Sequence, residues 1–113
     1  MTPPHIEHIG HKLTVTVKGD LTHFEIAELS KAVSSRLNAD IRDLEVNLAD
    51  CDIDESIALI ETINWLRDVL SKGLFVTLIE PPQLLAHDLY RVGHLLPGTK
   101  LTLVRPRNEI GYA

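Results

Sequence analysis

Acidic side chains gather immediately before a serine in the middle of the chain. Asp50, Asp52, Asp54 and Glu55 precede Ser56, and an amphipathic segment follows. Asp52 or Asp54 can accept hydrogen bonds from the free N–H groups at the start of a helix, and the other carboxylates favour the positive end of its dipole. Ser56 is therefore expected at a helix N-terminus, where a phosphate group is well tolerated.

The same acidic residues also permit a second chemistry, which is calcium binding. Their spacing reproduces positions 1, 3, 5, 8 and 12 of an EF-hand loop, filled here by Asp50, Asp52, Asp54, Ile57 and Glu61. The sixth position carries Glu55 instead of the glycine that the sharp turn needs. An EF-hand also needs an incoming helix, and the apolar residues of segment 39–49 fit either a helix or a strand.

Other catalytic or metal-binding patterns are missing from the sequence. We find no nucleophile with a base at helical spacing, no glycine-rich phosphate loop and no paired catalytic carboxylates. His5, His8 and His11 recur every third residue, so in an extended segment they do not converge as zinc ligands would. We therefore expect no enzyme activity, no catalytic residue, no metal site and no cofactor.

Length and composition indicate one small acidic domain. The 113 residues, 44% of them hydrophobic, suffice for a single core over residues 1–113. A net charge of −5 disfavours nucleic acid or an anionic membrane surface as partner. The lone Cys51 suggests a buried thiol in a reducing compartment, and no apolar run approaches the length of about 18 residues that a membrane span needs. We expect a cytoplasmic protein without direct membrane insertion.

Strand-like and helix-like segments alternate along the chain. Apolar residues alternate with polar ones at 13–17 and 44–48, and a partner strand is expected at 5–10. Thr22 and Glu25 form a capping box before a helix whose buried stripe is Ile26, Leu29, Val33 and Leu37. A second helix is expected from about 54 to 72, stopped by Gly73, then a strand at 74–79, a helix from Pro81-Pro82 to Gly93 and a last strand at 101–104. This order predicts an α/β sheet whose later strands run parallel.

The second helix carries two apolar stripes. Its buried face is expected at Leu59, Ile63, Leu66 and Leu70, while Ala58, Thr62, Trp65 and Val69 form a stripe directed away from the sheet. Trp65 on that stripe is either packed against a neighbouring helix or serves as an anchor for a protein partner, because exposed Trp is enriched at interfaces.

The order of these elements, with the Gly19-Asp20-Leu21 turn, the acid-serine turn, Gly73, the proline-containing helix and Gly93, resembles a STAS domain. This family includes bacterial anti-sigma factor antagonists, sulfate-transporter tails and accessory subunits of lipid transporters. The resemblance spans most of the chain and implies a single-domain mixed sheet of four to five strands covered by three to four helices. In the antagonists the turn usually reads Asp-Ser-Ser-Gly, and an anti-sigma kinase phosphorylates the second serine. The corresponding residues here are Asp54, Glu55, Ser56 and Ile57.

The resemblance implies a non-enzymatic regulatory domain in bacterial signal transduction and transcription regulation. Its partner would be an anti-sigma factor or a serine-kinase-like protein, with Ser56 as the phosphorylated residue. The expected partner-binding residues are Asp52, Asp54, Glu55, Ser56, Ile57 and Trp65. The alternative is an accessory subunit that docks on the ATPase of an ABC-type lipid transporter and is not phosphorylated.

Overall fold

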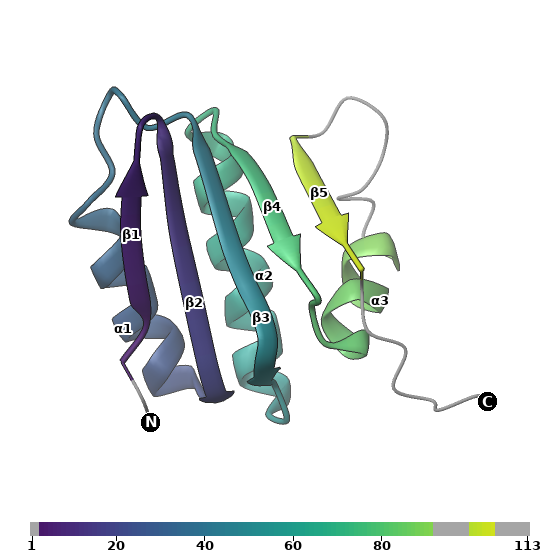
Figure 1. Ribbon diagram of the computed structural model, residues 1–113. Helices are drawn as coiled ribbons and strands as arrows, with labels where there is room; N and C mark the ends of the chain where they lie inside the picture. Colours follow the sequence, from purple (N-terminus) through teal and green to yellow (C-terminus); the bar gives the residue numbers. More distant parts are fainter. Residues whose placement is uncertain (1–2, 92–99, 106–113) are drawn as a thin grey trace.

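Five strands lie side by side in one sheet, in the order in which they follow along the chain (Figure 1). The computed structural model describes residues 3–91 and 100–105. Strand β1 runs antiparallel to β2, and β2 to β5 are parallel to one another. The strands are β1 (His5–Ile9), β2 (Lys12–Asp20), β3 (Asp43–Asp52), β4 (Phe75–Ile79) and β5 (Leu101–Val104). The predicted mixed α/β sheet is confirmed.

Three helices of the described part connect the parallel strands: α1 (His23–Ser34), α2 (Ser56–Ser71) and α3 (Gln83–Arg91). From β2 to β5, each connection leads to the neighbouring strand on the same side. Because such connections between parallel strands are right-handed, connections that all proceed in one direction across the sheet place their helices on the same face. Figure 1 shows α1 and α2 behind the sheet, and α2 packs against α1, α3 and β4. The side chains directed at this layer, including Leu13, Val15 and Val46, are buried.

Helix α1 starts as the sequence predicts. Thr22 is its N-cap, and Thr22 and Glu25 form a capping box in which the Thr22 N–H donates to the Glu25 carboxylate at 3.0 Å. Ile26, Leu29 and Val33 form its buried stripe, while the predicted fourth member, Leu37, lies beyond the helix and is half-buried. The capping box fixes the N-terminus of α1 at the edge of the sheet where β2 ends.

Helix α2 starts later than predicted and has a different cap. Its first residue is Ser56 and its N-cap is Glu55, so the prediction that Asp52 or Asp54 caps this helix is wrong. Asp52 is the last residue of β3 and Asp54 lies in the short connection after it. The C-terminal end agrees with the prediction, since Gly73 follows the C-cap Lys72 with a φ of 86° that suits glycine.

The last elements are β4, α3 and β5. Pro81 and Pro82 are buried and precede α3, which packs Leu85 and Leu89 into the core. The predicted end of this helix at Gly93 lies outside the described residues. No helix in the described ranges has both the length and the apolar character needed to cross a membrane.

Candidate protein-interaction site

A bulge in β3 decides which way the acidic side chains point. Thr16 pairs with Asn47 and Lys18 with Asp50, so two steps along β2 match three along β3. In β3, every second residue is therefore buried at Leu44, Val46 and Leu48. After the bulge the buried positions are shifted by one residue, to Cys51 in the strand and Ile53 just after it. Unbroken alternation would have directed residues 50, 52 and 54 at the core. Because of the bulge, these three aspartates are exposed at the carboxyl end of the strand.

Glu55 joins the N-terminal ends of the two helices. Its carboxylate accepts a hydrogen bond at 3.1 Å from the backbone N–H of His23, the first residue of α1. The same oxygen lies 3.6 Å from Nδ1 of His23. Glu55 makes no side-chain cap bond to α2, although it is the N-cap of that helix. The Glu55 carboxylate therefore satisfies a free N–H group at the start of α1. The first turn of α2 receives no capping hydrogen bond from the side chain of its own N-cap residue.

Ser56 is the first residue of α2, and its side chain is exposed. The helical hydrogen-bond ladder begins where the N–H of Leu59 donates to the carbonyl of Glu55 at 3.0 Å. The amides before Leu59 point out of the helix end, as at every helix N-terminus. The hydroxyl thus stands beside N–H groups that can donate to an anion. The structure agrees with the predicted position of Ser56, and its phosphorylation stays a prediction.

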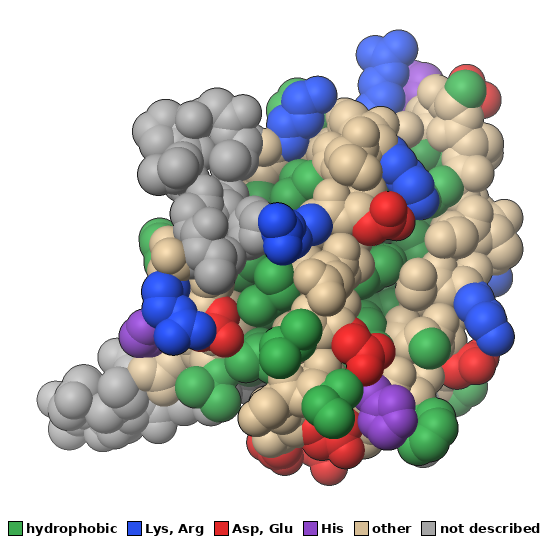
Figure 2. Space-filling model, turned by 180° about the vertical axis from the view of Figure 1, so that it is seen from behind, with side chains coloured by type: hydrophobic (Ala, Val, Ile, Leu, Met, Phe, Trp, Pro, Cys, Tyr) green, Lys and Arg blue, Asp and Glu red, His purple; other side chains and the backbone are tan. Residues whose placement is uncertain are grey.

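Exposed apolar side chains accompany the acidic ones at this end of the molecule. Ile57 and Ile60 on α2 are each 59% exposed, and Phe24 in the first turn of α1 is 71% exposed. The Phe24 ring lies against that of His23, with centroids 4.1 Å apart. Figure 2 shows hydrophobic, acidic and histidine side chains together along its lower edge. We call this set the acid-serine surface: Asp52, Asp54, Glu55, Ser56, Ile57 and Phe24.

Trp65 does not belong to this surface. Its side chain is only 7% exposed, and Ala58, Thr62 and Val69 on the same stripe are also buried. The prediction that this stripe points away from the sheet is wrong, and with it the partner-anchor role of Trp65. Of the predicted buried face, Leu66 is buried, whereas Leu59, Ile63 and Leu70 are half-buried at the margin of the core. Because α2 is the middle helix and has α1 on one side and α3 on the other, both of its apolar stripes are covered.

The edge of Trp65 lines a shallow groove of about 360 Å³ between α1 and α2. Glu61, Asn64 and Asp68 on α2 and Ser30 on α1 border the same groove. Its mixed polar lining and the buried position of the indole ring are typical of the seam between two packed surface helices.

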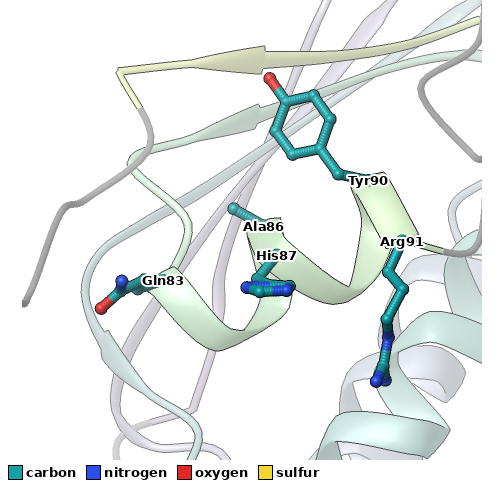
Figure 3. A pocket seen from close by; sticks show the side chains of 5 residues that line it. All are labelled: Gln83, Ala86, His87, Tyr90 and Arg91. Atoms are coloured by element: carbon teal, nitrogen blue, oxygen red, sulfur yellow. The ribbon is translucent and has the colours of Figure 1, made fainter.

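A second hollow, of about 550 Å³, follows the outer side of α3 (Figure 3). The described residues that line it are all on this helix: Gln83, Ala86, His87, Tyr90 and Arg91. Figure 3 shows Tyr90 and Arg91 pointing to opposite sides of α3, so their polar groups do not converge on a common point. A catalytic site needs such convergence, and the described residues that line this hollow do not provide it.

The EF-hand interpretation conflicts with the backbone. The segment that enters the acidic stretch is strand β3 and not a helix, and Asp50 and Asp52 still belong to that strand. Among residues 3–91 and 100–105, no group of three or more His, Cys, Asp or Glu side chains is placed to hold a metal ion. The carboxylates are directed outward side by side, so they do not wrap around a common centre.

Sequence reasoning missed the contribution of α1 to this surface. His23 and Phe24 follow the N-cap Thr22 and fall outside the buried stripe of Ile26 and Leu29. A large apolar residue off the buried stripe, in the first turn of a helix, was the available signal. The contact between His23 and Glu55 depends on how the two helices align and so on tertiary structure.

Comparison with solved structures identifies the architecture. SpoIIAA, a Bacillus cell fate determinant solved in its phosphorylated form, superposes with a TM-score of 0.67 at 13% identity, over 89% of this chain and 90% of its own. RsbS from Moorella thermoacetica gives a TM-score of 0.66 at 14% identity, over 90% of this chain and 87% of its own. The structure of Mglu gives 0.59 at 21% identity, and the match covers 66% of this chain but 18% of the Mglu chain.

No family model matches the chain, and no curated protein matches it. The evidence for its class is therefore the backbone: a five-stranded mixed sheet with helices between the parallel strands. The two small proteins in the comparison share this architecture along nearly their whole length. The chain has a STAS-like fold.

Proposed function

We propose that the protein is a regulatory interaction domain that binds a protein partner through the acid-serine surface. The observation that carries the proposal is the exposed Ser56 at the first position of α2, set between exposed carboxylates and the exposed Ile57. Exposed apolar side chains supply contact area, and the surrounding charges select the partner. A partner with a largely apolar docking surface fits this arrangement.

Phosphorylation of Ser56 would act as a switch. A phosphate adds about −1.5 to −2 charges near neutral pH and can accept hydrogen bonds from the first-turn amides of α2, so the fold should tolerate it. The new charge would join those of Asp52, Asp54 and Glu55, and a partner surface that is acidic or apolar there would be repelled or left desolvated. Binding would therefore weaken while the domain stays folded.

The comparisons support this proposal at the level of architecture. SpoIIAA is described as an anti-sigma factor antagonist and was solved both with and without its phosphate. By analogy, we propose an anti-sigma factor or a serine-kinase-like protein as the partner of this chain. Its position in a bacterial transcription-regulating pathway is part of the same proposal.

A capture experiment from the source cells tests the switch. The parent protein, Ser56→Ala and Ser56→Asp are used as baits, and bound proteins are quantified by mass spectrometry, together with the phosphorylation state of Ser56 in the parent. Ser34→Asp is the control, because Ser34 is exposed at the far end of α1. We expect the Ser56→Asp bait to capture about tenfold less partner than the parent bait. The amounts captured by Ser56→Ala and Ser34→Asp should be close to that of the parent. Equal retention by Ser56→Ala and Ser56→Asp would reject the switch.

The departures from the antagonist motif favour one alternative. Glu55 supplies a permanent negative charge where the family has its first serine, and the branched Ile57 stands where a kinase would meet glycine. A domain of this kind that is not phosphorylated would fit an accessory subunit docked on the ATPase of an ABC-type lipid transporter. The capture experiment distinguishes the two, since an ATPase bound equally by the Ser56→Ala and Ser56→Asp baits would support this alternative.

A further inference from the structure

The edge of the sheet where the parallel strands begin is lined by basic residues. Lys12 opens β2, Arg42 immediately precedes β3, Lys72 lies between α2 and β4, and Lys100 immediately precedes β5. We call these four the basic rim. Each of the four parallel strands therefore starts at or shortly after a Lys or Arg.

Backbone hydrogen bonds hold the basic rim in register across the sheet. The N–H of Arg42 donates to the carbonyl of His11 at 2.8 Å, and the N–H of Phe75 donates to the carbonyl of Arg42 at 2.9 Å. The N–H of Val76 donates to the carbonyl of Lys100 at 2.8 Å. Since neighbouring strands are about 4.8 Å apart, the rim forms one continuous row.

The opposite edge, where these strands end, is acidic. Asp20 and Asp52 are the last residues of the paired strands β2 and β3, and Glu80 follows β4. The β3 bulge and the connection to α2 add Asp50, Asp54 and Glu55. Lys18 and Arg105 also lie at this end, and Arg105 is 3.8 Å from Glu80. Asp40 and Asp43 lie near the basic rim, where Lys12 is 3.5 Å from Glu45 and Lys72 is 3.4 Å from Asp68, so the charge of each end is partly balanced within the molecule. Figure 2 shows Lys and Arg predominantly in the upper half of the view and Asp and Glu predominantly in the lower half, with some Lys and Arg at the two sides lower down.

Exposed apolar side chains accompany the charges at both ends. Ile9, next to the β1–β2 turn, is 63% exposed, and Phe75, at the start of β4, is 54% exposed. The Lys100 ammonium lies 5.0 Å from the centroid of the Phe75 ring. The acidic end has Phe24, Ile57 and Ile60. Acidic residues near the N-termini of α1 and α2 and basic residues near their C-termini also interact favourably with the helix dipoles. The dipoles do not explain why exposed apolar side chains lie beside these charges.

We propose that copies of this protein associate head to tail, with the basic rim of one copy, including Phe75 and Ile9, docked on the acidic end of the next. Opposite charge on two ends of the same molecule makes each end the complement of the other, and the apolar side chains supply contact area in each half of the interface. The contact is heterologous, so it leaves one free basic rim and one free acidic end on every chain of copies. A contact that rests on a few exposed charges is weak and depends on salt concentration.

Sedimentation velocity over a wide range of protein concentration tests this association. At about 0.01 M salt, where the Debye length is about 30 Å, the mean sedimentation coefficient should rise with protein concentration. The rise should disappear at about 1 M salt, where the Debye length is about 3 Å. Arg42→Glu with Lys100→Glu cancels the net charge of the four rim residues, and Asp50→Lys with Asp54→Lys removes most of the net charge of the acidic end. Each double variant should self-associate at least about tenfold more weakly than the parent.

Mixing the two double variants is the decisive measurement. One variant keeps the parent acidic end and the other keeps the parent rim, so the mixture should associate again. Lys31→Glu with Arg67→Glu is the control for net charge, since both residues are exposed on the outer faces of α1 and α2, and it should behave like the parent. Thermal unfolding by circular dichroism verifies that every variant is folded.

No concentration dependence at low salt, association that survives in both double variants, or failure of the mixture to associate would each overturn the proposal. The outcome is independent of the proposed function. Ser56→Asp adds negative charge to the acidic end, so it should leave self-association intact or strengthen it, whereas it should weaken binding of the regulatory partner.

Discussion

The carboxylate of Glu55, at the N-cap of α2, accepts its hydrogen bond from the backbone N–H of His23 in α1. One side chain thus holds together the starts of two helices that are separated in sequence by strand β3. At this position the antagonist motif has serine, whose shorter side chain has less reach. Glu55 therefore combines a negative charge with a structural link across the acid-serine surface.

The link between Glu55 and His23 should contribute measurable stability. Glu55→Ala removes the acceptor for the first N–H of α1, and loss of a helix-end acceptor costs about 0.5 to 1 kcal/mol. Glu55→Gln keeps an acceptor oxygen and should lose less. Urea denaturation measures both. Glu28→Ala is the control, because Glu28 is exposed on α1 and its carboxylate lies as far as 4.0 Å from the Lys31 ammonium, which makes a weak ion pair. Identical unfolding free energies for the parent and Glu55→Ala would show that the contact contributes nothing.

Trp65 should behave as a core residue. Truncation of a buried indole leaves a cavity, so Trp65→Ala should lower the free energy of unfolding by about 3 to 5 kcal/mol, and Trp65→Phe by less. The chain has one Trp, so its fluorescence reports on this position alone. Native emission should be blue-shifted and resist quenching by acrylamide. Red-shifted, readily quenched emission with a loss below about 1 kcal/mol would mean that the ring faces solvent.

A negative charge at Ser56 should leave the domain folded. At the start of α2 the added charge is favoured by the helix dipole and opposed by the nearby carboxylates, so Ser56→Asp should change stability by less than about 0.5 kcal/mol. Ser71→Asp is the matched variant at the other end of the same helix, where the dipole disfavours it by about 0.3 to 1 kcal/mol. Chemical denaturation compares the two. A larger loss in Ser56→Asp than in Ser71→Asp would show that the first turn of α2 does not tolerate charge.

Local patterns predicted the elements well because each depends on neighbours in sequence. The capping box of Thr22 and Glu25 and the positive φ of Gly73 mark helix ends that are formed by the chain immediately around them. Alternation in β2 and in the first half of β3 reflects one buried face of the sheet. These features need no knowledge of the rest of the molecule.

Orientation of α2 and capping of its start could not be predicted in the same way. The helix has two apolar stripes, and only the presence of α1 and α3 on its two sides explains why Trp65 is buried. Glu55 could have capped its own helix, and its turn toward His23 depends on the alignment of α1 with α2. Both outcomes are set by contacts between elements distant in sequence.

The bulge in β3 also has a consequence for how this surface can evolve. Because side chains alternate along a strand, one extra residue opposite β2 converts inward positions into outward ones for Asp50 and Asp52. Loss of a codon at the bulge would leave both carboxylates outward, because Asp50 would then follow Leu48 in simple alternation, whereas a codon gained after the bulge would turn them toward the core and be strongly selected against. Substitutions at the same positions would alter the charge of the surface and leave the core intact. Added length in this strand is thus under much tighter constraint than the identity of its acidic residues, which leaves those residues free to diverge.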